Sequence, residues 1–529
     1  MSRPLRTIRA AAWRDLRTSV GVLVILYAGV IEIGLRSYVA SGGAAGMAGL
    51  QPLVQNPAVA ALYGRVSNLA NAGIFVVWKM GAFLLLVVAL WAALNATRMT
   101  RGHEDDGSWD MMVIGRRDRA AVLGTLTAVL LESGAIVGAV CALVMWLGGQ
   151  DAMGSWYFGL GVTAAAWSGT SIGLVASQVA APRRAASQAS IAVIVVAFFV
   201  RVLADASVST LWLRDVSFFG WVEKLGAFEH SDVAALAPAL SGPVVLAFSL
   251  WWLQERRDAG GALWTHADSA RARGHMLSST WTFAWRERSS VWRWWTLGLA
   301  AFGVIVGYLT HALVSLAQTD PAYVALLDRW GLGAMISGAG FIALAAVIMS
   351  VAFTFMVMSW ISSVAGDEIK GRLDVALATG PRRAAWMASV VLSALVAVSV
   401  AATVTILAMW WGVRISGTSM PLRTVAEAVG ASLGLTPFIV GGSIFLVARV
   451  PRLAFAIGSV FILVEYIVQA LGPTLHWPRW LLESDPFYYL RPVPVQPFNF
   501  SELLWVSLIG AVIGAAGMWR YVRRDHVTS

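Results

Sequence analysis

The chain contains few charged residues for its length. Of its 529 residues, 13% are charged and 58% are hydrophobic, and the mean hydropathy is +0.70. Soluble domains usually contain about 25% charged residues. This deficit excludes a water-soluble enzyme and indicates one large body embedded in a lipid bilayer.

Cysteine and lysine are almost absent. Cys141 is the only cysteine, which excludes an intrachain disulfide and a thiolate metal site. Lysine accounts for only three of the 39 basic residues, Lys79, Lys224 and Lys370, and none lies in a G-x-x-x-x-G-K-[ST] loop that would bind ATP. No H-E-x-x-H motif or nucleophile elbow is present either. We therefore expect no catalytic residue, no metal site and no cofactor in this chain.

Long apolar runs are abundant, and twelve of them are long enough to cross a bilayer. They fall near residues 18–37, 73–95, 120–147, 155–180, 187–206, 235–254, 294–315, 336–361, 385–412, 424–448, 453–471 and 502–520. Arginine clusters occupy alternate connecting loops, which the positive-inside rule assigns to the cytoplasm. The pattern predicts an all-α polytopic membrane protein with twelve transmembrane helices and both termini cytoplasmic. Because topology explains the basic excess, we expect no nucleic-acid partner.

Two blocks of sequence recur with a shift of 264 residues. Pro57-Ala58 recurs as Pro321-Ala322, and the block with Glu104, Gly107, Asp110 and Arg119 recurs as Glu368, Gly371, Asp374 and Arg383. The blocks keep their order, which predicts two parallel six-helix repeats. We place the first half at 1–256, beginning with an amphipathic helix at 1–17. A cytoplasmic linker follows at 257–280, and the second half occupies 281–529.

The recurring loop block predicts a short amphipathic helix in each half, at about 103–119 and 367–383. Acids gather at its start and arginines at its end, as the helix dipole favours. Trp109, Met112 and Val113 form an apolar stripe, and Leu373 takes the place of Trp109 in the second half. Such a helix either lies on lipid or docks a cytoplasmic partner. The acids favour docking, because anionic headgroups would repel them.

Ionisable residues inside predicted spans are candidates for a substrate cavity. Glu32 and Lys79 lie at similar depth, so they either form an ion pair or line the cavity together with Trp78. Glu132 and Glu465 lie about 20 Å from the inner ends of their spans at 1.5 Å per residue, so each needs a buried partner or a wet cavity. A cationic amphiphile is one ligand that such acids would suit.

Several motifs, taken in order, resemble a known family. They are Trp13-Arg14-Asp15, Asn56-Pro57-Ala58, Glu104-x-x-Gly107-x-x-Asp110, Ser217-Phe218-Phe219-Gly220-Trp221 and the closing Arg523-Arg524-Asp525. With this spacing the chain resembles permease subunits of ATP-binding-cassette (ABC) exporters with the type 2 membrane fold. Within them it is similar to the fused twelve-span, tetronasin-type antibiotic and multidrug exporters. It departs from the family at Ser217-Phe218, where members often have Ser-Pro.

The resemblance implies that the two loop helices are coupling helices for a separate ABC ATPase, in two copies, which would bind ATP and Mg. The residues implied are Glu104, Gly107, Trp109, Asp110 and Arg119, and in the second half Glu368, Gly371, Leu373, Asp374 and Arg383. The chain itself would hydrolyse nothing. It would export a hydrophobic or amphiphilic drug-like compound across the bacterial plasma membrane.

Three alternatives compete with this interpretation. A proton-coupled twelve-span secondary drug transporter also has parallel repeats, and Glu132 would be its proton carrier. A lipid or polymer exporter of the same ABC fold differs only in its cargo. A polytopic lipid-processing enzyme lacks support from any catalytic motif in the sequence.

Overall fold

A computed structural model gives the fold of the chain. It describes residues 3–48, 57–113, 119–180, 182–206, 208–229, 232–245 except 236, 243 and 244, 279–319, 333–369, 382–471 and 477–524, and the single residues Gln51, Val54, Pro321, Val324, Gly371, Leu373 and Leu377. The chain divides into two compact units, Met1–Ala270 and Arg271–Ser529. Nearly all of the predicted linker at 257–280 lies outside the described residues.

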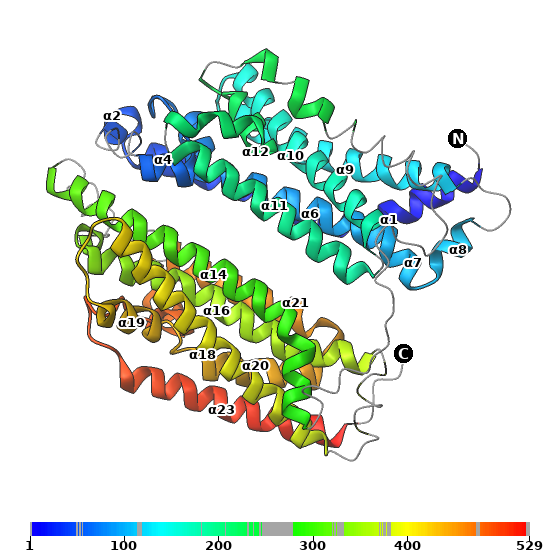
Figure 1. Cartoon of the computed structure of the whole chain (residues 1–529), viewed down its shortest axis with the longest axis vertical. Coiled ribbons are helices and arrows are strands. Elements are labelled where there is room, and N and C mark those ends of the chain that lie inside the picture. Colours follow the sequence, from blue (N-terminus) through cyan, green and yellow to red (C-terminus); the bar gives the residue numbers. More distant parts are fainter. Residues whose placement is uncertain are drawn as a thin grey trace. The chain divides into compact units, whose positions relative to one another are not determined.

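In its described part, the first unit is built from five long helices and several short ones. Its long helices are α1 (Arg3–Ala40), α6 (Ala82–Thr97), α9 (Arg119–Leu147), α10 (Ala152–Val179) and α11 (Arg183–Ala206). The short ones are α2 (Gly43–Met47), α4 (Pro57–Tyr63), α5 (Ala72–Val76), η2 (Val77–Gly81), η3 (Arg98–Gly102), α7 (His103–Asp105), α8 (Ser108–Val113), η4 (Val208–Asp215), α12 (Phe218–Lys224) and η5 (Val233–Ala235). In Figure 1 the start of α1 lies with α7 and α8 at one end of this unit, and α2 and α4 lie at the opposite end.

Small residues let the long helices of the first unit approach closely. A Cβ atom on Gly169 of α10 would lie 2.1 Å from the carbonyl oxygen of Ala89 in α6. A Cβ atom on Gly138 of α9 would lie 2.4 Å from the carbonyl oxygen of Gly159 in α10. Such backbone contacts replace large side chains as the packing surface, as is common between membrane helices.

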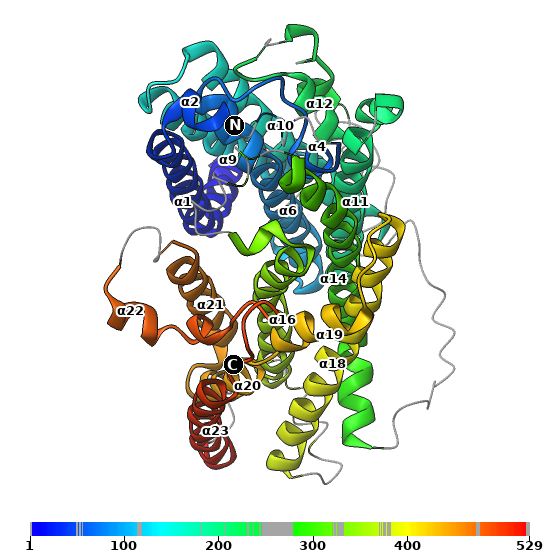
Figure 2. The same ribbon diagram turned by 90° about the vertical axis from the view of Figure 1, so that its left-hand side faces the viewer.

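The second unit has the same character. Its helices are α14 (Thr280–Thr319), η6 (Gly333–Ile336), α16 (Gly338–Ile369), α18 (Arg383–Ile415), α19 (Leu422–Ala431), α20 (Thr436–Arg449), η7 (Pro451–Leu453), α21 (Ala454–Leu471), α22 (Arg479–Ser484), η8 (Pro486–Tyr489) and α23 (Phe500–Arg523). Helices α20 and α23 lie side by side, as Figures 1 and 2 both show. The buried core of the unit is built mainly from α14, α16, α18, α20 and α23.

Ten helical stretches of the described residues are long and apolar enough to cross a membrane. They are Leu5–Ala40, Ala72–Asp105, Arg119–Leu147, Ala152–Val179, Arg183–Asp205, Thr280–Thr319, Gly338–Ile369, Arg383–Ile415, Leu422–Arg449 and Phe500–Arg523. They coincide with ten of the twelve predicted spans. Of the other two, 235–254 lies mostly outside the described residues, and 453–471 corresponds to the 18-residue helix α21. The chain is an all-helical, multi-pass membrane protein in the part that is described, and the number twelve stays a prediction.

Candidate functional site: the two ends of the second span

The second span, Ala72–Asp105, is a helix with a wider π turn near each end. These turns are η2 (Val77–Gly81) and η3 (Arg98–Gly102). A π turn displaces side chains from the regular helical positions, and such turns occur frequently at functional sites. Each π turn lines one of two cavities in the first unit. We call them the aromatic cavity and the arginine cavity.

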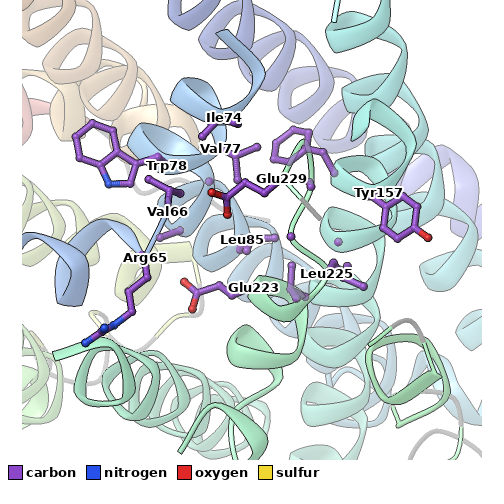
Figure 3. A pocket seen from close by; sticks show the side chains of 18 of the residues that line it. Arg65, Val66, Ile74, Val77, Trp78, Leu85, Tyr157, Glu223, Leu225 and Glu229 are labelled. Atoms are coloured by element: carbon purple, nitrogen blue, oxygen red, sulfur yellow. The ribbon is translucent and has the colours of Figure 1, made fainter. Parts of the chain in front are cut away.

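The aromatic cavity lies beside η2 and has a volume of about 70 Å³. Four aromatic residues line it, Tyr63, Trp78, Tyr157 and Phe158. Figure 3 labels Trp78 and Tyr157 among them. Trp78 is 5% exposed and packs on Tyr63, with 5.3 Å between the ring centroids. Within the described part of the chain, the buried Nε1 of Trp78 has no hydrogen-bond partner. An indole N–H normally finds an acceptor when it is buried, so a donor left without one is unusual.

Charged groups complete the aromatic cavity (Figure 3). Glu223 of α12 and Glu229 contribute carboxylates. Arg65 also lines the cavity, but its guanidinium points away from it and donates from Nε to the carbonyl oxygen of Asp205 at 3.0 Å. Glu229 accepts a hydrogen bond of 2.7 Å from the backbone N–H of Ser67. The cavity therefore combines aromatic residues with two carboxylates, which suits an amphiphilic ligand.

Glu223 also belongs to a buried ionic cluster that the sequence did not reveal. Its carboxylate pairs with Arg201 of α11, and Arg214 pairs with Asp205 at 2.5 Å. Burial raises the pKa of Glu223 to about 7, although the positive charge of Arg201 opposes this rise. Four residues from α11, η4 and α12 meet here only because those elements fold back on one another.

The predicted pair of Glu32 with Lys79 is wrong. Glu32 forms an ion pair with Arg36, one turn further along α1, at 2.6 Å. The Lys79 ammonium lies 5.1 Å from the centroid of the Phe75 ring, a cation–π distance. Glu32 pairs with Arg36 because a partner four residues away on the same helix is within reach without any particular packing of neighbouring helices.

The two acids predicted near mid-membrane both have partners. Glu132 accepts hydrogen bonds of 2.8 and 2.9 Å from Arg9 and one of 3.2 Å from the indole of Trp13. Glu465 of α21 interacts with the carboxyl of Asp485, which is fully buried and accepts a hydrogen bond of 2.7 Å from the Phe487 N–H. Of the five predicted cavity residues, Trp78 alone lines the aromatic cavity. The set does not converge on one site within either unit.

The arginine cavity lies beside η3 and has a volume of about 150 Å³. Helix α1 contributes Asp15 to its wall, and α11 contributes its first residue, Arg183. The π turn contributes Arg98, helix α7 contributes His103, and the turn after α7 contributes Asp106. Residues at the start of the recurring loop block therefore form part of the cavity wall.

The predicted helix at 103–119 is interrupted in the structure. Helices α7 and α8 are separated by a turn at Asp106 and Gly107, and residues 114–118 lie outside the described residues. Gly107 has φ +75°, a left-handed conformation that glycine adopts without strain, and its N–H donates to the Glu104 carbonyl at 3.3 Å. Asp106 then starts α8 by accepting a bond of 3.0 Å from the Ser108 N–H. A continuous helix was therefore the wrong expectation for residues 103–113.

The second unit has the same turn 264 residues later. Gly371 has φ +68°, and its N–H donates to the Glu368 carbonyl at 3.0 Å. Glu368 belongs to the last turn of α16, and Arg383 begins α18 just as Arg119 begins α9. Asp374 lies outside the described residues. Equal backbone geometry at two shifted positions is what a repeat would produce.

The apolar stripe of α8 faces the protein. Trp109 is 3% exposed and packs with Ala12 of α1 and Leu123 of α9, and Met112 and Val113 pack against the same cluster. Leu373, in the equivalent position, is 1% exposed. Trp109 therefore anchors the loop to its own unit, with the half-buried Met112 and Val113 beside it.

The recurring glutamate at the head of each block is largely covered by protein, with a side chain 10% exposed at Glu104 and 1% exposed at Glu368. Glu104 pairs with Arg101 at 2.5 Å, and Glu368 pairs with Arg524 and lies 3.9 Å from Arg383. The surface of α8 is formed instead by Asp110 and by Met111, which is 67% exposed. Glu104 and Glu368 thus hold the loops in place, and Asp110 and Met111 are the groups that a partner would meet.

Sequence comparison places the chain beside an efflux permease. Residues 277–522, which run from α14 nearly to the end of α23, match the family described as "Multidrug efflux system permease Rv1217c, C-terminal domain". Over 482 residues the chain is 28% identical to the multidrug efflux system permease protein Rv1217c of Mycobacterium tuberculosis. This alignment covers 89% of the chain and 86% of that relative. The chain is thus a multi-pass membrane protein that is similar, along most of its length, to a multidrug efflux permease.

Proposed function

We propose that the chain is the permease subunit of a drug exporter. It moves a hydrophobic or amphiphilic compound out across the bacterial plasma membrane, and ATP hydrolysis on a separate ABC ATPase drives the movement. The observation that carries this proposal is the similarity to a multidrug efflux permease over 89% of the chain. The lack of a P-loop in the sequence supports an energy source on another subunit.

Two ATPase copies would dock on the two loop blocks, one in each six-helix half of a twelve-span molecule with cytoplasmic termini. The geometry of α8 supports a docking role. Trp109 fixes the helix to the core, while Asp110 and Met111 remain exposed. Because the loop leads into α9 at Arg119, a push on α8 would move that span.

The aromatic cavity is the proposed contact site for the transported compound in the first unit. Its rings can stack on apolar parts of an amphiphile, and the carboxylate of Glu229 can bind a polar group. Drug pockets commonly combine apolar walls with a few polar groups in this way.

A second candidate function is proton-coupled drug transport. One observation favours it, the neighbouring carboxyls of the half-buried Glu465 and the buried Asp485, which are able to hold a proton between them. Glu132, the acid first considered for this role, is bound by Arg9 and Trp13.

Co-purification separates the two candidates. The full-length permease is purified from its native membrane, and proteins that accompany it are identified. We expect a P-loop ATPase in stoichiometric amount, and we expect Asp110→Lys with Met111→Glu to release it. Both side chains are exposed, so the variant leaves the core intact. Glu427→Lys is the control, since this exposed acid lies on α19, outside the loop blocks.

The opposite result would overturn the proposal. A permease that purifies without an ATPase, and that exports drug when only a proton gradient is imposed, would establish the secondary transporter instead.

A further inference from the structure

The arginine cavity is not used by the proposed transport function, yet its charges are distinctive. Arg98 and Arg183 reach it from different helices. In the part of the chain that the structure describes, neither guanidinium has a hydrogen bond or an ion pair; the bond from Arg183 to Asp105 comes from the backbone N–H. A Cβ atom on Gly102 would lie 3.3 Å from Cδ of Arg183, so the glycine leaves room for this side chain across the π turn.

Two carboxylates line the same cavity. Asp15 comes from α1, and Asp106 comes from the turn before α8. Hydrogen bonds from the Ser108 hydroxyl and N–H hold the pKa of Asp106 below its usual range, so it is charged at neutral pH. His103 shares a hydrogen bond of 2.8 Å with the Ser108 hydroxyl. The wall therefore carries two positive and two negative groups.

This charge pattern excludes the simplest ligands. The two carboxylates disfavour a plain anion, and the two guanidiniums disfavour a plain cation. A ligand that carries an anionic and a cationic group close together matches both pairs. Guanidinium binds phosphate through paired hydrogen bonds, and a primary ammonium donates three hydrogen bonds to carboxylates.

The location of the cavity points to a lipid. Its residues lie where the stretch Ala72–Asp105 ends and where the stretch Arg183–Asp205 begins. The ends of spans lie at the depth of lipid headgroups. A volume of about 150 Å³ is room for several groups the size of a water molecule, since one water needs about 10–15 Å³.

We propose that the arginine cavity binds the phosphoethanolamine headgroup of a membrane lipid. The phosphate lies between Arg98 and Arg183, and the ammonium lies against Asp15 and Asp106. The bound headgroup joins α1, the second span and α11 at one end of the unit. The site requires only that the protein is embedded in a membrane, so it stands or falls independently of the proposed transport cycle.

The test measures lipid binding to the full-length chain. The purified, delipidated permease is titrated with phosphatidylethanolamine, phosphatidylcholine or phosphatidylglycerol of equal chain length, and bound lipid is counted by native mass spectrometry. We expect about tenfold tighter binding of phosphatidylethanolamine than of phosphatidylcholine, whose quaternary nitrogen has no N–H to donate. We expect Arg98→Ala with Arg183→Ala to remove this binding, and Asp15→Asn with Asp106→Asn to shift the preference to phosphatidylglycerol.

Matched controls keep the test decisive. All four charged side chains are exposed, so their removal leaves the core unchanged, and equal unfolding temperatures verify this. Arg17→Ala and Asp110→Asn remove exposed charges near the cavity but outside its wall, and we expect them to bind lipid as the wild type does.

Three results would overturn the assignment. One is equal binding of phosphatidylethanolamine and phosphatidylcholine to the wild type. Another is displacement of the lipid by inorganic phosphate alone, which would identify free phosphate as the ligand. The third is unchanged lipid binding in the double arginine variant. If that variant keeps its lipid binding but loses a co-purifying protein, the two arginines bind a protein partner and not a lipid.

Discussion

Two adjacent glycines of α20 are expected to respond in opposite directions to the same substitution. A Cβ atom on Gly441 would lie 1.8 Å from the carbonyl oxygen of Gly510 in α23. A Cβ atom on Gly442 would meet no atom within 4 Å. Both residues lie inside the same helix, so their helix propensities and backbone entropies change equally. The difference between the two alanine variants therefore isolates the close contact between α20 and α23.

The structure sets the size of the effect. Carbon and carbonyl oxygen come no closer than about 3.3 Å in ordinary contacts, so Gly441→Ala must separate the two helices by more than about 1 Å. Overpacking of this kind costs about 1–3 kcal/mol. Gly442→Ala lacks that cost and gains about 0.5–1 kcal/mol from reduced backbone entropy in the unfolded chain.

The assay is unfolding of the purified protein in one detergent, followed by tryptophan fluorescence against temperature and denaturant. We expect Gly441→Ala to unfold before the wild type and Gly442→Ala to unfold after it. Equal stabilities of the two variants, or a more stable Gly441→Ala, would refute the packing of α20 against α23 as described.

Three further predictions concern buried charge and the aromatic cavity. Glu368→Gln removes the negative charge that this 1% exposed side chain presents to Arg524, and it should lower stability by about 3–5 kcal/mol. Glu427→Gln removes an exposed pair with Arg423 and should change stability by less than about 0.5 kcal/mol. Denaturant unfolding of both variants measures the contrast, and equal effects would contradict it. Burial, with a contribution from the neighbouring Glu465, raises the pKa of Asp485 to about 8, so the folded state holds a proton that the unfolded state releases near its usual value of 3.8. Stability should therefore fall as pH rises from about 4 to 8. Unfolding temperatures measured at pH 5, 6.5 and 8 should depend less on pH in Asp485→Asn than in the wild type. The same pH dependence in both proteins would contradict the raised pKa of Asp485. Trp78→Ala should reduce export of an amphiphilic dye about tenfold. Trp78→Phe should reduce it by less, since phenylalanine keeps a ring but loses the N–H. Trp212→Ala, at a 64% exposed position, is the control, and an equal loss of export there would show that the cavity is not on the transport path.

Periodic and compositional features of the fold were accessible from the sequence. The run at 120–147 became α9 (Arg119–Leu147), and the run at 385–412 became α18 (Arg383–Ile415). Hydropathy predicts such helices because the cost of placing each residue in lipid depends on that residue alone. The shift of 264 residues likewise pointed to two glycines that share one unusual backbone conformation, at Gly107 and Gly371.

The candidate site was much less accessible. Trp78 was named beside Lys79, but the π turn that places it in a cavity wall has no signature in the hydropathy pattern. The break after Asp106 depends on one glycine φ angle and one side-chain hydrogen bond. Glycine within an otherwise helical pattern permits such a break without requiring it.

The sequence by itself determined which segments are apolar helices, which residues recur, and that no ATP-binding loop is present, because these properties belong to single residues and their spacing. Only the tertiary structure decided which charges meet. Glu132 finds Arg9 at a separation of 123 residues, and Glu368 finds Arg524 at a separation of 156. The same folding buries Trp109, covers most of the Glu104 side chain, and leaves Asp110 and Met111 at the surface. An ion pair depends on which helices are neighbours and on how each is rotated about its axis, and the packing of the whole unit sets both.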